Sequence, residues 1–557
     1  MHHRQWRTKT CGERGCGKSM TLLFNSLPVQ HLLARRGSRP LSFELMGVYV
    51  PCNTPLSHKR EFQLLDGFRA SVISEHLFVL SIAFSIADTL SHVPDIMTPR
   101  EDASLRQQFA YMIGGDLPSS GTVLDAIKQY VERECIRAQR AANSRRSTDV
   151  FFEDTYSFAS LIVPLVRSLR GVEKLKASHF AFLIDDAHDL NEYQRRSLFS
   201  WIAYRDHSQF SFKVAIASVT QASLETAAGG SILEGHDYTR IDMAAPIHNE
   251  ESDFGRLAAM LISKRLKKAG IDATPEDFFP ISPQMLAALE ESERHVRKEA
   301  EEKYGEDRHR ISDYVYKYKR AHFFRSRPAT ANRAEYSGFD TLVFLSTGVI
   351  RNLLIPCYWM FDKVRSIASE DAGHVEANSD ALAEAGSQMV IPPKVQSEVI
   401  LDRSRRLWDW LEKELDKSIE NCSRDTARRA FQLLDNLAVL FRERLLKHKS
   451  EPRATSFTIS SADEFVMAKL LPVLEVLVAA QLLCVRSGPA KEKGRRESYF
   501  VPNRMLWPAR GLDPHGQHAR VSLPAAELWN AADLNKAIPF SDSDEASSKQ
   551  QRLFDVD

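Results

Sequence analysis

One eight-residue segment near the amino end limits the folds open to this chain more than any other feature. Residues 12–19 read GERGCGKS, which is the pattern G-x-x-x-x-G-K-S, and the apolar helix pattern SMTLLFNSL follows at once. Glycines let backbone N–H groups turn inward around phosphates, and a helix beginning at Lys18 adds its positive end. The segment therefore predicts a nucleotide site in an α/β domain.

The residue types of this loop assign an expected role to each part. Lys18 would reach the β- and γ-phosphates, and the Ser19 hydroxyl would bind Mg²⁺. The residues expected to line the nucleotide are Gly12, Glu13, Arg14, Gly15, Cys16, Gly17, Lys18, Ser19 and Met20. ATP is accordingly the predicted nucleotide and Mg²⁺ the predicted metal.

The segment before the loop lacks the apolar residues of a buried strand. Residues 4–11 (RQWRTKTC) contain no Val, Ile, Leu or Phe. Either this strand is unusually polar, or the natural protein begins upstream of Met1. We hypothesise the second, which upstream coding sequence continuing in frame with an apolar strand would support and an in-frame stop would rule out.

A second motif places two acids at the end of a buried strand. Residues 182–186 read FLIDD, so three apolar residues of a parallel strand are followed by Asp185 and Asp186. This is the Walker B pattern, in which Asp185 would hold Mg²⁺ through water and Asp186 would orient or deprotonate the attacking water. Asp186 stands where Glu is more usual, and its shorter side chain favours slow hydrolysis. A buried strand with a polar end is the plainer alternative.

A further strand follows the Walker B segment. Residues 212–218 (FKVAIAS) form another buried-type run, and an extra strand at this place marks the ASCE division of P-loop proteins. Its terminal polar residue, Ser218 or else Thr220, would contact the water or the γ-phosphate, as sensor 1 does. A simple strand cap is the other interpretation of these residues.

Composition excludes several classes of protein. Lys and Arg total 74 against 73 Asp and Glu, and the net charge of +1 argues against a globally basic nucleic-acid coat protein. The seven dispersed cysteines form no C-x-x-C pair and no zinc spacing, which fits a reducing compartment. The longest apolar stretch, residues 77–87, is too short to span a bilayer and reads as a buried helix. We expect a cytoplasmic protein.

Pattern changes along the chain predict its organisation. The P-loop core is expected over residues 1–243, with a mostly helical insert at about 58–170 and strands near 43–50, 179–185, 212–218 and 238–243. Later elements are a helical lid at 244–366 that includes one charged helix at 282–322, a flexible acidic linker at 367–399, a structured block at 400–535 and a tail at 536–557.

The motifs, taken with the phrases LIDDAHDL, GHDYTRID and LSTGVIRNLL, resemble AAA+ ATPases. The similarity is to the prokaryotic family related to origin-recognition-complex and initiator ATPases, over about residues 11–365. It implies an α/β P-loop (ASCE/AAA+) core with a parallel sheet, an α-helical lid and a C-terminal winged-helix-like domain. It also implies that Arg351, after Gly348, is a sensor 2 arginine that closes the lid on the γ-phosphate, unless it is a surface residue. Arg205 and Arg240 are candidates for an arginine finger that acts on a neighbour's nucleotide.

The C-terminal block fits a winged helix only in part. A helix at 424–448, a strand at 455–460, a helix at 462–482 and two strands around a polar loop follow the expected order. Basic patches at 424–449 and 486–510 could meet DNA phosphates. The second helix, however, has only Lys469, Glu475 and Gln481 as polar residues, too few to read base edges, so it could instead be core or an oligomer contact.

Three functions are compatible with these features. The first is an ATP hydrolase that acts as a nucleotide-driven switch, associated with DNA through its C-terminal domain. The second is a signalling or defence-type NTPase scaffold that binds a protein partner, with little turnover; homo-oligomers are compatible with either. The third, a small-molecule P-loop kinase, would not require the Ser218 strand and the Arg351 lid in this order.

Overall fold

The computed structural model describes residues 8–12, 15–38, 40–52, 65–118, 121–143, 154–203, 208–217, 224–243, 253–326, 336–371, 389–419, 422–447, 454–489, 496–515 and 520–539. Contacts between Cα atoms divide the chain into two compact units. The first consists of Met1–Gly12 and Gly17–Met243, and the second of Glu13–Cys16 and Ala244–Asp557. Each unit is described by itself.

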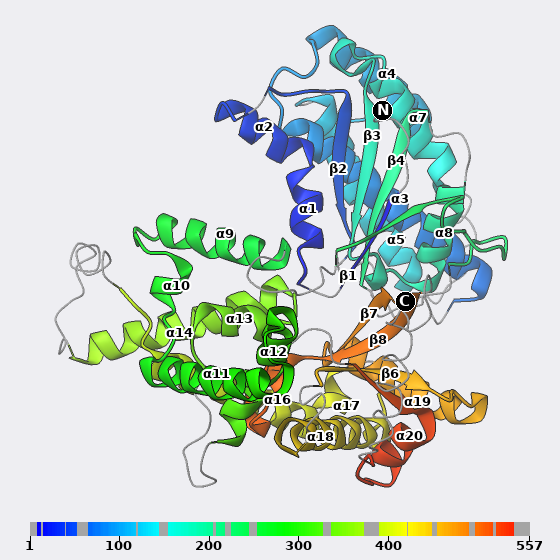
Figure 1. Cartoon of the computed structure of the whole chain (residues 1–557). Helices are drawn as coiled ribbons and strands as arrows, with labels where there is room; N and C mark the ends of the chain where they lie inside the picture. The colour runs from blue at the N-terminus through cyan, green and yellow to red at the C-terminus, as the bar shows by residue number, and fades with distance from the viewer. Residues whose placement is uncertain are drawn as a thin grey trace. The chain divides into compact units, whose positions relative to one another are not determined.

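The first unit is built on a five-stranded parallel sheet (Figure 1). Its order is β2-β3-β4-β1-β5, in which β1 spans Thr8–Gly12, β2 Leu45–Pro51, β3 His179–Asp185, β4 Phe210–Ala217 and β5 Thr239–Asp242. The strand predicted after the Walker B segment is β4, and it lies between β1 and β3. Because parallel strands end at one edge, the chain after β1 and the chain after β3 emerge on the same side of the sheet.

The strand before the phosphate loop exists and is polar. β1 reads TKTCG and pairs with β4 on one side and with β5 on the other. Thr8 lies opposite Lys213 in β4 and opposite Thr239 in β5. A strand with parallel neighbours on both sides has its backbone hydrogen bonds satisfied by them, so pairing compensates for the missing apolar side chains.

Alternate residues of β3 supply the cores on the two faces of this sheet. Phe180, Phe182 and Ile184 belong to the large core that the helical insert covers. Ala181 and Leu183 point the other way and pack with Leu22 of α1. The run is therefore apolar without alternation because both faces are buried, which is typical of a parallel sheet.

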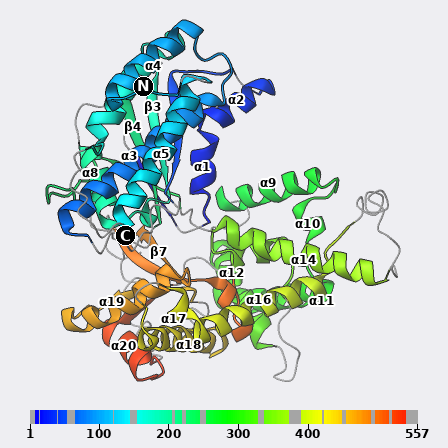
Figure 2. The same ribbon diagram turned by 180° about the vertical axis from the view of Figure 1, so that it is seen from behind.

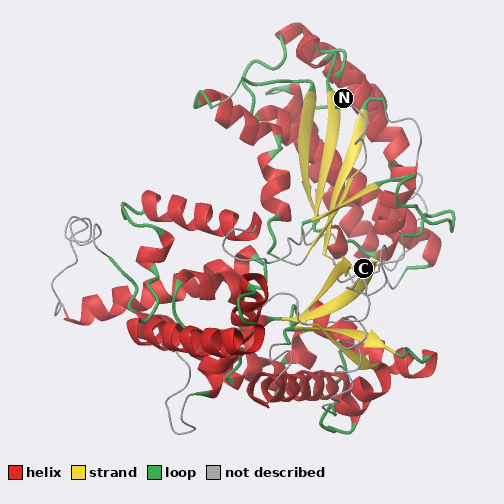
Figure 3. Cartoon of the chain, in the orientation of Figure 1, coloured by secondary structure: helices red, strands yellow, loops and turns green. Residues whose placement is uncertain are grey.

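The other elements described in the first unit are helices (Figures 2 and 3). They are α1 (Lys18–Phe24), α2 (Leu27–Arg35), α3 (Gly67–Ser91), α4 (Pro99–Ile113), α5 (Val123–Asn143), η2 (Phe158–Ile162), α7 (Val163–Leu169), η3 (Glu173–Leu175), η4 (Ala187–Asp189) and α8 (Glu192–Ala203). By length and composition α3 could cross a membrane, but 72% of its most apolar window is buried inside the fold. It is thus a buried core helix, in agreement with the sequence prediction for residues 77–87.

The second unit begins with a helical region whose charged segment was predicted wrongly as one helix. It contains α9 (Asp253–Lys268), α10 (Pro275–Phe278), α11 (Pro283–Tyr304), α12 (Arg308–Arg325), α13 (Phe339–Leu345) and α14 (Ile350–Asp371). α11 ends at Gly305, which has φ 61°, and the Asp307 side chain caps α12 by accepting from the Arg310 N–H. The two helices pack as a pair over Val296, Ala300, Ile311 and Val315, a small core of their own.

A left-handed break separates α13 from α14 within the helical lid that the sequence predicts over 244–366. Thr347 has φ 56° and Gly348 has φ 77°. The Thr347 hydroxyl accepts the backbone N–H of Arg504 at 2.9 Å, and its carbonyl accepts the Arg486 guanidinium at 3.3 Å. The break is therefore held by the C-terminal block of the same unit.

The boundaries of the predicted acidic linker also need correction. α14 continues to Asp371 and α16 (Pro393–Lys413) begins with a proline in its first turn, so both ends of the interval 367–399 are helical. Proline at the first helical position has the backbone angle that a helix needs, which explains the early start. The middle of the predicted linker, residues 372–388, lies outside the described residues.

The C-terminal block combines helices with a four-stranded sheet. After α16 come α17 (Leu415–Ser418), α18 (Arg424–Lys447), β6 (Ser456–Ser460), α19 (Glu464–Ala479), β7 (Leu483–Pro489), β8 (Arg496–Pro502), η6 (Arg504–Leu506), η7 (Pro508–Arg510), β9 (Arg520–Pro524) and α20 (Ala525–Asp533). The sheet order is β7-β8-β6-β9. β7 and β8 form the predicted antiparallel pair, whereas β9, parallel to β6, and α20 had no specific sequence prediction.

This block shares a core with the helical region. Met505 of η6 belongs to the same buried cluster as Phe339, Leu342 and Ile391. The Tyr336 hydroxyl donates to the carbonyl of Leu512 at 3.0 Å. The two parts of the second unit are therefore one packed body.

Candidate functional site

The phosphate loop connects β1 to α1 through two left-handed glycines. Gly15 has φ 89° and Gly17 has φ 105°, angles that only glycine adopts without strain. Lys18 is the first residue of α1 and is only 5% exposed, whereas Ser19 is half-buried and Met20 is exposed. Cys16 is buried, Gly12 is the last residue of β1, and Glu13 and Arg14 lie outside the described residues.

Asp185 is buried at the end of β3 and is held by two hydrogen bonds. Its Oδ2 accepts the Tyr49 hydroxyl at 2.8 Å, and its Oδ1 accepts the backbone N–H of Asp186 at 3.0 Å. The backbone carbonyl of Asp185 accepts the N–H of Cys52 at 3.0 Å. The orientation of this carboxylate is thus fixed by the neighbouring strand β2, while each oxygen keeps a free lone-pair direction.

Asp186 stands in a sparsely populated backbone conformation beside Asp185. Its φ is 52°, which an aspartate tolerates better than most residues. Burial and the Asp185 charge raise the pKa of Asp186, and His188 and Lys18 oppose the shift. That opposing effect of Lys18 means that the loop lysine lies within electrostatic reach of the twin aspartates.

The donor set fits a divalent cation of the magnesium type. Mg²⁺ prefers oxygen ligands and keeps several waters, so one hydroxyl and one or two carboxylates suffice beside substrate phosphates. Ser19 and Asp185 supply these groups. Among the residues that the structure describes, no group of three His, Cys, Asp or Glu could hold a metal by itself. The hydroxyl of Ser19 and the carboxylate of Asp185 fit a cation whose remaining ligands are phosphate oxygens and waters.

The predicted sensor 1 residues lie outside the described residues. Ser218 and Thr220 lie just past the described end of β4, and Arg205 lies between the described residues 203 and 208. The register does place Ala217 of β4 opposite Gly12 of β1, so the chain leaves β4 at the edge of the phosphate loop. Arg240 is exposed in β5, opposite Lys9.

Arg351 is the second residue of α14, directly after the left-handed break. Its backbone N–H donates to the Gly15 carbonyl at 3.2 Å. A Cβ built on Gly15 would meet the Arg351 Cβ at 2.6 Å and its Nε at 3.2 Å, so only glycine fits there. Gly15 and Arg351 both belong to the second unit, so this contact lies within that unit.

The basic segments of the C-terminal block are largely engaged within the protein. Arg486 and Arg504 are buried, and burial lowers the pKa of Arg504 to about 10. Arg510 pairs with Asp435 and lies over the Trp408 ring. In α18, Arg428 and Arg429 both pair with Asp425, and Arg444 is buried. Residues 490–495, which contain two lysines and an arginine, lie outside the described residues.

Tyr49 and Cys52 are parts of the site that sequence reasoning missed. The sequence predicts the strand over 43–50 but does not reveal that this strand pairs with β3, in register Tyr49 to Leu183. The available signal was a tyrosine near the carboxyl end of a strand next to the phosphate-binding edge. Burial and Asp185 raise the pKa of the Tyr49 hydroxyl, so it stays a hydrogen-bond donor at neutral pH.

The comparisons with known proteins agree with these features. The family model described as ORC-CDC6-like matches residues 11–286 and 280–523, which together cover most of the chain. Neither the search of curated proteins nor the search of solved structures found a significant match.

Proposed function

The chain belongs to the ORC-CDC6-like family of AAA+ P-loop ATPases, and from this premise we propose that it is an ATP-driven molecular switch. The observation that carries the proposal is the convergence of Lys18, Asp185 and Asp186 at one edge of the sheet. The buried Lys18 near the buried Asp185 and the half-buried Asp186 suits a ligand that carries both positive and negative charge. MgATP, with its cation and its anionic phosphates, is such a ligand.

The side chains would divide the work as follows. Lys18 and the amides of the glycine loop bind the phosphates, and Ser19 with Asp185 holds Mg²⁺, which when bound neutralises phosphate charge. Asp186 accepts the proton of the attacking water, because its raised pKa makes its carboxylate a stronger base than an ordinary aspartate. Ser218 contacts the water or the γ-phosphate, and Arg351 contributes the lid cation.

Two variants test the site. Lys18→Ala should abolish ATP binding, because the variant lacks the buried cation that meets the phosphates. Asp186→Asn should retain binding and lose turnover. The exposed Lys176 gives a matched control, Lys176→Ala, which should change neither. ATP affinity by calorimetry and turnover by phosphate release measure both effects. Unchanged ATP binding in Lys18→Ala would refute the phosphate-loop assignment.

We propose that the switch is associated with DNA through the C-terminal block, whose helix, strand, helix and antiparallel pair follow a winged-helix order. ATP would close the lid on the core, and hydrolysis would release it. Duplex DNA that stimulates turnover in a salt-sensitive manner supports this function. Co-sedimentation at low and high salt measures the binding. The mass of the protein with and without ATP tests whether nucleotide also drives homo-oligomer formation.

One observation favours a second candidate, a signalling or defence-type scaffold with little turnover. The arginines of 424–449 and 486–510 that are described are mostly buried or paired within the protein, which leaves fewer of them for phosphates. Tightly retained nucleotide without DNA binding at low salt would support the scaffold. In either case we propose a cytoplasmic protein, since at least six of the seven cysteines are free thiols.

A further inference from the structure

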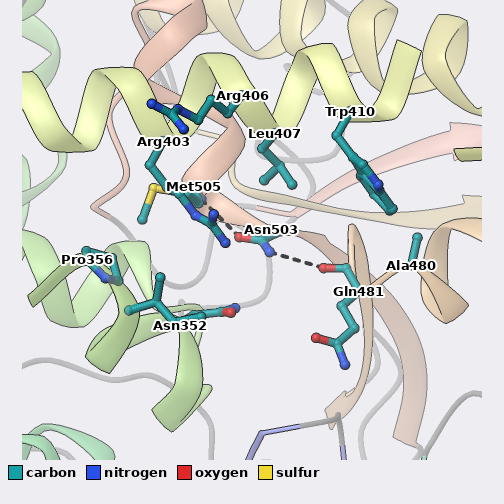
Figure 4. Close-up of a pocket in the computed structure, with 11 residues that line it drawn as sticks. Asn352, Pro356, Arg403, Arg406, Leu407, Trp410, Ala480, Gln481, Asn503 and Met505 are labelled. Atoms are coloured by element: carbon teal, nitrogen blue, oxygen red, sulfur yellow. Dashed lines mark hydrogen bonds between the residues drawn. The ribbon is translucent and has the colours of Figure 1, made fainter. Parts of the chain in front are cut away.

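A cavity of about 440 Å³ lies in the second unit, and none of the residues that line it is assigned above to ATP (Figure 4). Its walls come from α14, α16, the end of α19 and the turn that contains Asn503 and Met505. The volume is within the range of roughly 300–1,000 Å³ that small-molecule sites occupy. The cavity is therefore large enough for a ligand rather than for a few waters.

One face of α16 supplies a cation and an aromatic ring to this cavity. Arg403, Arg406, Leu407 and Trp410 follow the spacing i, i+3, i+4, i+7, which places them on one side of the helix. In Figure 4 the side chains of Arg403 and Trp410 both extend from α16 toward Asn503 and Gln481. Two helical turns, about 10 Å, separate the two positions along the helix.

Arg403 has no charge partner among the residues that the structure describes. Its guanidinium makes no hydrogen bond or ion pair with any of the described residues, and none of the residues that line the cavity is acidic. Burial lowers the pKa of Arg403, and the neighbouring Arg406 lowers it further. Arg406 itself is paired with Asp402 at 2.8 Å. A partly buried cation that faces a cavity without a counter-charge is the environment in which an anion binds.

The rest of the lining suits a planar heterocycle. The Trp410 indole N–H donates to the Ser418 hydroxyl, which fixes the ring, and aromatic rings of this kind stack on nucleobases. Gln481 is held at φ 60°, and its side-chain amide has no partner among the described residues. Asn352 also lines the cavity. Amide groups offer both donors and acceptors, as a base edge requires.

We propose that this cavity is a second, regulatory binding site for a nucleoside 5′-monophosphate, distinct from the ATP site. Arg403 binds the phosphate, Trp410 stacks on the base, and Gln481 and Asn352 bind its edge. α14 carries Arg351, whose N–H donates to Gly15, and also Asn352, which lines the cavity. A ligand in the cavity therefore contacts the same helix that contacts Gly15. The site does not depend on the function proposed above.

Calorimetry on the full-length Lys18→Ala chain tests the site, because this variant removes the phosphate-loop lysine and isolates binding elsewhere. AMP, GMP, CMP and UMP are the probes. At least one of them should bind with one-to-one stoichiometry. Adding Arg403→Gln or Trp410→Leu should weaken that binding about tenfold or more. Arg405→Gln is the matched control, since Arg405 is exposed on the same helix and does not line the cavity.

Two results would overturn the proposal. One is the absence of saturable binding of all four monophosphates at millimolar concentration. The other is binding that survives both Arg403→Gln and Trp410→Leu in proteins whose circular dichroism and thermal unfolding match the parent. Failure of the proposed ATP site would be seen separately, as equal ATP affinity in the wild-type and Lys18→Ala chains.

Discussion

At the scale of single residues, the site depends on how neighbouring strands hold one carboxylate. Asp185 has one oxygen bound by the hydroxyl of Tyr49 and the other by the backbone of Asp186. The left-handed φ of Asp186 is the local cost of turning the chain away directly after the strand. Both contacts restrict the rotation of the Asp185 carboxylate before any ligand arrives, so the fold itself holds the proposed metal ligand in place.

Tyr49→Phe should weaken magnesium-dependent ATP binding about tenfold, because a hydrogen bond to a charged group contributes about 1.5–3 kcal/mol. The measurement is ATP affinity as a function of Mg²⁺ concentration. Tyr111→Phe is the control, since Tyr111 is 89% exposed in α4. An unchanged magnesium dependence in Tyr49→Phe would show that the backbone contact alone positions Asp185.

Glu134 gives a prediction for pH dependence. It is 6% exposed, lies 3.5 Å from Nε2 of His76 and binds Arg137 at 2.7 Å. Burial tends to raise the pKa of Glu134, but the contacts with His76 and Arg137 outweigh burial and lower it. A lowered carboxyl pKa means that the stabilisation is complete above the unfolded-state value, about 4.3, and is lost as pH falls through the folded-state value.

Glu134→Gln should therefore lower the free energy of unfolding by about 1–2 kcal/mol at pH 7. The difference from wild type should shrink as pH falls below the usual glutamate value. Urea denaturation across this range measures it, and Glu132→Gln, on an exposed position of α5, is the control. A difference that stays constant with pH would mean that the charge of Glu134 contributes nothing.

At the scale of elements, the break between α13 and α14 sets the position of Arg351. Thr347→Val keeps the shape of the side chain but leaves the buried N–H of Arg504 without its acceptor. We expect the free energy of unfolding to fall by about 1–3 kcal/mol, measured by chemical denaturation. Thr341→Val is the control, because that buried hydroxyl binds only a carbonyl one helical turn away. Equal effects of the two variants would contradict the role given to Thr347.

The elements that sequence reasoning found are those with strong local signals. The apolar run of β3 is predicted to the residue because burial on both faces leaves no ambiguity in its pattern. β1 gave no such signal, because its sequence is polar. Its place in the sheet comes from backbone pairing with β4 and β5. The stop at Gly305 and the start at Pro393 were local signals that were overlooked.

For the candidate site, Lys18 and the aspartate pair are predicted from motif spacing alone, and Lys18 lies within electrostatic reach of Asp186. The role of Tyr49 depends on which strand lies next to β3, and a single sequence does not contain that information. The same holds for the arginines of the C-terminal block. Their residue type suggested a basic surface, whereas only the fold shows that Arg486 and Arg504 point into the protein.

At the scale of the whole molecule, the helical region and the C-terminal block form one body. Arg320 pairs with Asp513 at 3.0 Å, and the Trp408 indole donates to the Leu506 carbonyl at 2.9 Å. A fragment of residues 244–557 should therefore fold and unfold in a single cooperative transition, followed by circular dichroism. Fragments 244–371 and 389–557, prepared separately, should lack a sharp transition. A sharp transition in either of the shorter fragments would show that it is an independent domain.

The position of β1 has a consequence for the synthesis of the protein. This strand leaves the ribosome long before both of its partners, because β4 and β5 begin only at Phe210 and Thr239. Pairings between distant segments form slowly, and domains fold as units during translation. A nascent chain that has not yet extended past Asp242 has no completed sheet around its glycine loop. It should gain the ability to retain nucleotide only when this late part has emerged.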